Sequence, residues 1–344
     1  MSAAGYVAAA VAGGLGMYLG IGGLLEWLYY RRRRGDAARW KIQPTRWPKV
    51  GARRRELVLG CANMSAASVA SGLFAHHVAT GGASSIYFDL SRHSLAAAIA
   101  SAIVYFVVTD GVLYGAHRLL HARVLFRHVH RVHHRWTSPT AFTAAAMHPL
   151  EFAIYQGVML APLFVWPIHV VGLVVVLVYQ NTIALLDHSG VDLGSVLPWQ
   201  PPPRFHDDHH VHFHVNYGQT LGLWDRIFGT WRRVGRVYGE HVFGGRGAPL
   251  DAAATAATAG AAERPRFVDY RGGRAAAATA ATAGAAERPR FVDYRGGRAA
   301  AATAATAGAA ERPRFVDYRG GRAAAAAAPA AAPRAATPDQ DPAS

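Results

Sequence analysis

Apolar stretches of membrane length constrain the fold of this 344-residue chain more than any other feature. A helix of about 20 mostly apolar residues crosses a bilayer core. Three stretches of this kind lie at residues 6–30, 57–80 and 95–116. A fourth, residues 152–186, is too long for one span and contains Pro162 and Pro167, so we expect a tight helical hairpin that enters and leaves the membrane on one side. The chain is therefore predicted to be an all-α integral membrane protein with about four transmembrane helices or helical hairpins.

The distribution of positive charge predicts which side of the membrane each loop faces. Residues 31–34 are four consecutive arginines, and arginines and lysines recur as far as residue 55. Because cytoplasmic loops have such an excess of positive charge, alternation along the chain places residues 31–56, 117–151 and 187–245 in the cytoplasm. We expect a multi-pass protein of the plasma membrane in a bacterium, or of the endoplasmic reticulum in a eukaryote, with its active site on the cytoplasmic face.

The formal net charge of +15 would suggest nucleic-acid binding in a soluble chain. Here the basic residues cluster beside the spans, where they act as topology signals and contact lipid headgroups. We therefore expect a membrane and no nucleic acid as the partner of this charge. The single cysteine, Cys61, leaves no internal disulfide and no cysteine-based zinc site.

Histidines cluster just outside the predicted spans in three short motifs. The first histidine box is His117 and His121, the second is His130, His133 and His134, and the third is His206, His209 and His210. Imidazoles spaced i, i+3 and i+4 lie on one side of a helix, where they can converge on a metal. The predicted topology returns all three boxes to one compartment. The sequence therefore predicts a polynuclear metal site in a histidine-rich helical cap on the cytosolic side.

The number and type of these ligands limit the metal. Zinc usually takes four ligands, so eight imidazoles suit two metals with positions left open for a small molecule. Imidazole ligation allows Zn, Cu, Fe or Ni. The Glu-x-x-His pairs of carboxylate-bridged di-iron bundles and the His-Glu-x-x-His motif of zinc hydrolases are absent from the sequence. Two irons with all-nitrogen ligation, poised for O2, fit these residues best.

The histidine boxes also resemble a known family. "HRLLH", "HRVHH" and "HDDHH", in this order beside membrane spans, are similar to the fatty acid hydroxylase/sterol desaturase superfamily over residues 110–231. "TSPTAF…MHPLE" after the second box and "WKIQPTRWP" near Trp40 resemble other segments of that family. Residues 214–232, "HVNYGQTLGLWDRIFGTWR", resemble the segment that follows the third box in sterol C5-desaturases, the subfamily that this chain most resembles.

The resemblance implies an all-helical membrane enzyme with two non-haem iron ions and O2 as co-substrate. Such an enzyme desaturates or hydroxylates an unactivated C–H position of a lipid or sterol, and the metal ligands are its only catalytic residues. His148 and His188 lie where the family often keeps histidines, as ligands or as hydrogen-bond partners of ligands. The implied ligand set is His117, His121, His130, His133, His134, His148, His188, His206, His209 and His210. Asp187-His188 departs from the His-Asp order that sterol C5-desaturases usually have here.

Other polar residues near the boxes have less specific roles. His128, His212 and His214 could be hydrogen-bond partners of the ligands or incidental. Asp110 lies inside the third span, where a charge facing lipid is costly, so we expect it to face the protein interior. Asp225, in "WDRIFGT", is expected to hold the cytosolic cap together. We expect no ligand role for His76, His77, His93, His169 and His241.

The electrons that O2 activation consumes must come from another protein, because the sequence has no haem- or flavin-binding fingerprint. The resemblance implies a separate donor, cytochrome b5 or a ferredoxin with its reductase. An arginine-rich cytosolic face would attract an acidic donor.

Several other functions are compatible with the sequence. Within the same class, a fatty-acyl, 4-methylsterol or carotenoid hydroxylase would use the same boxes. A histidine-rich metal transporter belongs to another class, but its ligands should lie near the bilayer midplane, whereas these lie where spans end. A non-catalytic relative that binds sterol would not need the complete set of histidines.

The composition divides the chain into three regions. We expect membrane helices and a basic loop in residues 1–94, the catalytic domain in residues 95–245, and a low-complexity tail in residues 246–344. The tail has three nearly identical 24-residue repeats that end at Arg274, Arg298 and Arg322. Repeats of this length can form solenoids, but each has too few large apolar residues for a stacked core, so we predict disorder.

Overall fold

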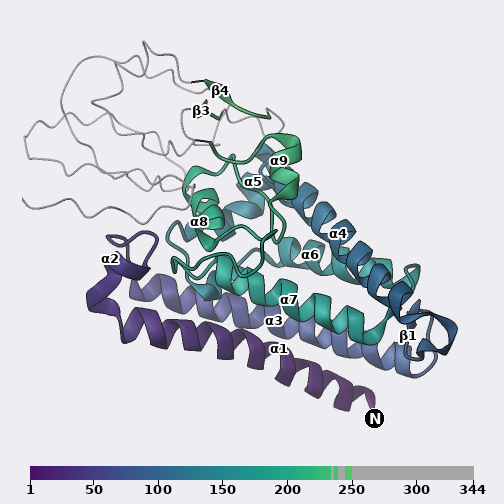
Figure 1. The fold of residues 1–344 in the computed structure, drawn as a ribbon. Coiled ribbons are helices and arrows are strands. Elements are labelled where there is room, and N and C mark those ends of the chain that lie inside the picture. Colours follow the sequence, from purple (N-terminus) through teal and green to yellow (C-terminus); the bar gives the residue numbers. More distant parts are fainter. Residues whose placement is uncertain (234–235, 239–244, 250–344) are drawn as a thin grey trace, which may run out of the picture. The chain divides into compact units, whose positions relative to one another are not determined.

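Long apolar helices dominate the structure, a computed structural model that describes residues 1–233, 236–238 and 245–249. Among these residues, four helices are long and apolar enough to cross a membrane. They are α1 (Ala3–Leu25), which continues as the π-helical turn η1 (Glu26–Arg31), α3 (Val50–Ala79), α4 (Leu95–Leu120) and α7 (Val170–Asp187) (Figure 1). The predicted all-α fold with about four membrane helices is confirmed. The repeats and His241 lie outside the described residues, and the domain boundaries at residues 94 and 245 stay predictions.

The hairpin predicted at residues 152–186 consists of two helices joined by an irregular turn. Helix α6 (Pro149–Leu160) continues as the 3-10 segment η6 (Ala161–Phe164), and α7 follows the short strand β2 (Ile168–His169). Strand β1 (Ile86–Tyr87) pairs with β2 in parallel, and the 3-10 segment η3 (Leu90–Arg92) follows β1. Because Pro162 and Pro167 cannot donate backbone hydrogen bonds, the chain reverses between α6 and α7.

Helix α3 begins at Val50 rather than at residue 57, so its first turns include three arginines and Glu56. Arginine and glutamate favour helix as much as most apolar residues do, and hydropathy alone does not detect them as part of the span. Glu56 is buried and accepts hydrogen bonds from the hydroxyls of Thr140, at 2.9 Å, and Thr143. The charged start of α3 is thus fixed against the segment that follows the second histidine box.

Small residues allow α1 to pack closely against α3. A Cβ atom on Gly72 of α3 would lie only 2.6 Å from the Cα atom of Val7 on α1. Such close approach through glycine is typical of helix pairs in membranes. Tyr18 of α1 reaches past α3 and donates a hydrogen bond to the carbonyl of Phe142 at 2.7 Å.

The outer surfaces of the spans are apolar. Val108 and Val112 on α4 and Val174, Val175 and Val178 on α7 expose about half of their surface or more. Apolar side chains are suited to contact with lipid hydrocarbon, whereas exposing an apolar surface of this size to water would be energetically costly. This surface agrees with the assignment of these helices as spans.

Short helical segments gather where α1, α4 and α7 end and where α3 and α6 begin. They are η2 (Arg34–Asp36), α2 (Ala37–Trp40), α5 (Arg123–His128), η4 (His130–Arg135), η5 (Ala141–Ala145), α8 (Pro203–His212) and α9 (Leu223–Phe228). Strands β3 (Arg236–Val237) and β4 (Ala248–Pro249) form an antiparallel pair later in the chain. The segments η4 and α8 contain the second and third histidine boxes, and the first box lies at the end of α4. This gathering is the predicted helical cap.

Candidate metal centre

Nine buried histidines form two groups within the described part of the chain. In each group, the nitrogen atoms available to a metal all lie within 4.8 Å of one another. The first group is His117, His121, His130, His134 and His209. The second group is His133, His188, His206 and His210. The eight histidines of the boxes therefore converge, and the structure brings His188 to them from the end of α7.

Each three-histidine box contributes to both groups. His130 and His134 belong to the first group, whereas His133 belongs to the second. In the third box, His206 and His210 belong to the second group, whereas His209 belongs to the first. Adjacent residues point about 100° apart on an α-helix such as α8 and about 120° apart on a 3-10 helix such as η4, so His209 and His210, and likewise His133 and His134, aim at different groups. The expectation that a whole box faces one side is therefore too simple, and the boxes interleave instead.

Hydrogen bonds to the Nδ1 atoms fix the orientation of four of these rings. His117 donates to the carbonyl of Tyr217, His209 to that of Val215, and His188 to that of Ala184, each at 2.7 Å. His130 donates to Oε1 of Glu151, also at 2.7 Å. A proton held on Nδ1 leaves the Nε2 lone pair available to a metal, as is usual for metal-binding histidines.

Glu151 is a functional residue that the boxes did not identify. Its carboxylate is fully buried in the first turn of α6 and contacts His130. The only signal in the sequence is its place in "MHPLE", a segment resembling the family. Carboxylate–histidine–metal arrangements raise the basicity of the ligand and hold its ring in place, so Glu151 is suited to do both for His130.

The Nε2 atoms of neighbouring rings approach one another within each group. In the first group the Nε2 atoms of His121 and His130 lie 2.9 Å apart, and in the second group those of His188 and His206 also lie 2.9 Å apart. Imidazole nitrogens bind zinc-like ions at about 2.0–2.1 Å, so two ligands of one ion lie roughly 3 Å or somewhat more apart. The donor set therefore fits two metal ions, one in each group.

Burial lowers the pKa of the imidazoles that lie outside the spans, because a low-dielectric interior disfavours their charged form. The pKa of His130 falls to about 3. That of His188 falls to about 4, although its hydrogen bond to Ala184 opposes the change. Neighbouring imidazoles add to the effect of burial at His133 and His206. The rings are thus neutral at neutral pH, which is the form that binds metals.

The structure does not bring His148 into either group. It is half-buried and its Nδ1 accepts a hydrogen bond from the backbone N–H of Leu150 at 3.1 Å, so it caps the N-terminus of α6. His128 is exposed, and His212 and His214 also lie outside both groups. The ring of His214 is nevertheless 6.2 Å from that of His121, so it borders the first group.

Two buried aspartates shape the cap around the groups. Asp110 on α4 accepts hydrogen bonds from the backbone N–H of Thr220 at 3.0 Å and from the indole of Trp224 at 2.9 Å. Asp225 accepts from the backbone N–H groups of Tyr217 and Gly218 at 2.8 and 2.7 Å. Asp110 therefore faces the interior, as expected, and Asp225 fixes the loop whose carbonyls orient His117 and His209.

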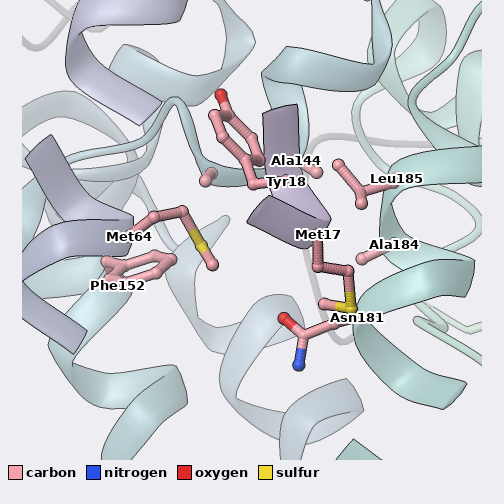
Figure 2. A pocket seen from close by; sticks show the side chains of 9 residues that line it. Met17, Tyr18, Met64, Ala144, Phe152, Asn181, Ala184 and Leu185 are labelled. Atoms are coloured by element: carbon pink, nitrogen blue, oxygen red, sulfur yellow. The ribbon is translucent and has the colours of Figure 1, made fainter. Parts of the chain in front are cut away.

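A cavity lies between α1, α3, α6, α7 and η5 (Figure 2). Apolar side chains from four helices, among them Met17, Met64, Phe152 and Leu185, point into it (Figure 2). Its wall on α7 includes Ala184, the residue whose carbonyl accepts the hydrogen bond from His188. An apolar cavity thus reaches the backbone that supports the second group.

Comparison with known proteins decides the family of the segment that contains the groups. Residues 102–230 match the sequence model of the family described as fatty acid hydroxylase. This segment belongs to the fatty acid hydroxylase family. All nine histidines of the two groups lie inside the fatty acid hydroxylase segment. No solved structure matches the chain significantly.

Several curated proteins are similar to the same part of the chain. Methylsterol monooxygenase 1 of Danio rerio is 34% identical over 139 residues, which are 39% of this chain and 48% of that protein. Lathosterol oxidase of Rattus norvegicus is 34% identical over 145 residues, 41% of this chain and 48% of that protein. Delta(7)-sterol 5(6)-desaturase of Leptosphaeria maculans is 34% identical over 134 residues, 38% of this chain and 37% of that protein. The chain thus spans about half or less of the length of these relatives.

Proposed function

We propose that this protein is an O2-dependent membrane oxidoreductase with two iron ions, which desaturates or hydroxylates a C–H position of a sterol-like lipid. The observation that supports it most is the pair of buried histidine groups inside a fatty acid hydroxylase segment. The relatives are named for both outcomes, a sterol monooxygenase and a sterol desaturase. Their shared substrate class favours a sterol over a fatty acyl chain or a carotenoid.

In this proposal the five imidazoles of the first group hold one iron and the four of the second group hold the other. When bound, the two irons supply the activation of O2 that oxidation of an alkyl C–H bond requires. The protein keeps the imidazoles neutral, fixes four of them through their Nδ1 atoms and encloses all nine away from water. His148 has a capping role in place of the ligand role that the family resemblance implies.

The cavity of Figure 2 has a volume of about 40 Å³, so we assign it to a small apolar part of the lipid and not to a whole sterol. Its apolar walls lie within the membrane-spanning helices, so a lipid can reach it without crossing water. The side-chain N–H of Asn181 donates to the carbonyl of Leu177 at 2.8 Å, which reduces the polarity of the one amide side chain in the wall. The cavity is therefore suited to hydrocarbon.

The proposal also includes a source of electrons and the side of the membrane that the cap faces. We assign the cap to the cytoplasmic face, because the arginines of residues 31–34 and 53–55 flank it. An acidic carrier such as cytochrome b5 or a ferredoxin would be attracted to this face and could deliver electrons one at a time.

Lipid mass spectrometry of membranes that express the chain tests this function. The matched variant is His133→Ala/His134→Ala, which removes one imidazole from each group, and His128→Ala is the control because that histidine is exposed and outside both groups. With iron and an electron donor supplied, we expect a sterol lacking two hydrogens or gaining one oxygen, formed by the wild type and the control only. No new product from sterols, acyl lipids or carotenoids would contradict the proposal.

A further inference from the structure

Residues 40–43 lie outside the fatty acid hydroxylase segment and contact the chain near the histidines of the second group. The backbone N–H of Ile42 donates to the carbonyl of Gly190 at 3.0 Å, and that of Asp192 donates to the carbonyl of Trp40 at 2.6 Å. Lys41 and Val191 form an antiparallel β-bridge. The segment is therefore attached to the chain directly after His188.

Side chains of the same segment reach two further pieces of the cap. The side-chain amide nitrogen of Gln43 donates to Oδ2 of Asp207 at 2.9 Å and to the carbonyl of Thr137 at 2.8 Å. The ammonium of Lys41, which is buried, donates to the hydroxyl of Ser138 at 3.0 Å. Burying a lysine is costly unless it is hydrogen-bonded, so this contact has a structural purpose.

These contacts fall beside every ligand of the second group. Thr137 follows His133 by one turn, Gly190 follows His188 by two residues, and Asp207 lies on α8 between His206 and His210. One short segment thus joins the three separate pieces of chain that contribute the second group's four imidazoles.

The two groups differ in how their own rings are held. Three imidazoles of the first group, His117, His130 and His209, have an Nδ1 acceptor. In the second group only His188 has one, and within the described residues the Nδ1 atoms of His133, His206 and His210 have no hydrogen-bond partner. The first group therefore has more of this local support than the second, although the Nδ1 atoms of His121 and His134 also lack a partner within the described residues.

We propose that residues 40–43 are a positioning strap for the second metal ion, and that Gln43 and Lys41 are its positioning residues. The strap depends on the proposed function in one respect, because it requires a metal ion in each group. Outer hydrogen-bond partners of metal ligands typically change metal affinity by about 10–100-fold. Loss of the strap should therefore release the metal of the second group and leave that of the first.

The test is the metal content of purified full-length protein after iron loading and dialysis against a weak chelator. We expect two irons per chain in the wild type and about one in Gln43→Leu. Gln200→Leu is the control for the same change of side chain, since Gln200 is a buried glutamine whose amide has no hydrogen bond to a ligand of either group within the described residues; it should keep two. Lys41→Met is a second variant, should Gln43→Leu fail to fold by circular dichroism.

Combined variants identify which ion is lost. Gln43→Leu with His210→Ala should keep about one iron, because both changes affect the second group, whereas Gln43→Leu with His121→Ala should keep none. Two irons in both Gln43→Leu and Lys41→Met, or the same loss in the two combined variants, would overturn the strap. Fewer than two irons in the wild type would instead contradict the proposed function.

Discussion

Four of the nine imidazoles are oriented by what their Nδ1 atoms contact. Backbone carbonyls perform this role for His117, His188 and His209, whereas His130 uses the carboxylate of Glu151. A side-chain substitution cannot remove a backbone carbonyl, but it can remove the carboxylate of Glu151. Glu151 is therefore the residue at which ring orientation can be tested directly.

Glu151→Leu should weaken iron binding in the first group by about 10–100-fold, the usual effect of losing an outer hydrogen-bond partner. Glu151→Gln should have a smaller effect, because its amide oxygen still accepts the proton of His130. Iron titration of the purified variants measures this difference. Equal iron affinity in both variants and the wild type would show that the contact does not orient the ring.

His148 and His188 provide a paired prediction, since the resemblance assigned both as ligands. His188→Ala should remove the iron of the second group, whereas His148→Ala should keep both irons and lower stability by about 1 kcal/mol through loss of the α6 cap. Iron content and thermal unfolding of the two variants distinguish these effects. Loss of an iron from His148→Ala would mean that His148 is a ligand after all.

At this scale the boxes predicted that their eight histidines converge, but not that His148 lies outside both groups or how the histidines divide between them. The i, i+4 spacing correctly pairs His117 with His121, and His206 with His210. His133 and His209 each lie in a different group from the other histidines of their own box. This division depends on how η4 and α8 face each other, which is a tertiary property. Glu151 has an ordinary helix-start position, so nothing local marked its contact with His130.

Among the elements, the spans were predictable because hydropathy over about 20 residues is the property that the membrane selects. The charged start of α3 was not, because Glu56 is stabilised by threonines far away in the sequence. The spacing of the second box predicted a helix, and the box lies on the 3-10 segment η4. The sequence also did not predict that Trp224 of α9 donates a hydrogen bond to the buried Asp110 of α4.

The pairing of α9 with α4 can be tested through Trp224. Trp224→Phe removes one of the hydrogen bonds to the buried Asp110, and an unsatisfied buried acceptor costs about 1–3 kcal/mol. We expect a lower free energy of unfolding in detergent, with Trp27→Phe, at a half-exposed site, as the unaffected control. In an Asp110→Leu background the effect of Trp224→Phe should shrink, and an undiminished effect would exclude the pairing.

The whole molecule places its polar chemistry at one end of an apolar helical assembly. Nine neutral imidazoles are buried there, and several of their Nδ1 atoms lack partners within the described residues. Buried polar groups without partners are costly, so bound metals should contribute to the stability of the whole protein as well as to its chemistry. The order of the spans predicted that the three boxes share one end, but the attachment of residues 40–43 required the structure.

Removal of metal should therefore destabilise the full chain. Each saturating ion adds RT ln(1 + [L]/Kd), which is about 4 kcal/mol at a free metal concentration one thousand times Kd. We expect a chelator to lower the thermal unfolding temperature of the wild type and restored iron to raise it again. The His133→Ala/His134→Ala variant should respond much less, and an unchanged wild type would mean that no structural metal is bound.

X-ray absorption at the iron edge, together with the iron count, tests the central claim most directly, because it reports the ligands of the ions in the intact protein. The two histidine groups predict two irons per chain and a ligand shell dominated by imidazole nitrogen in both. A single ion per chain, or a shell without imidazole scattering, would contradict this account.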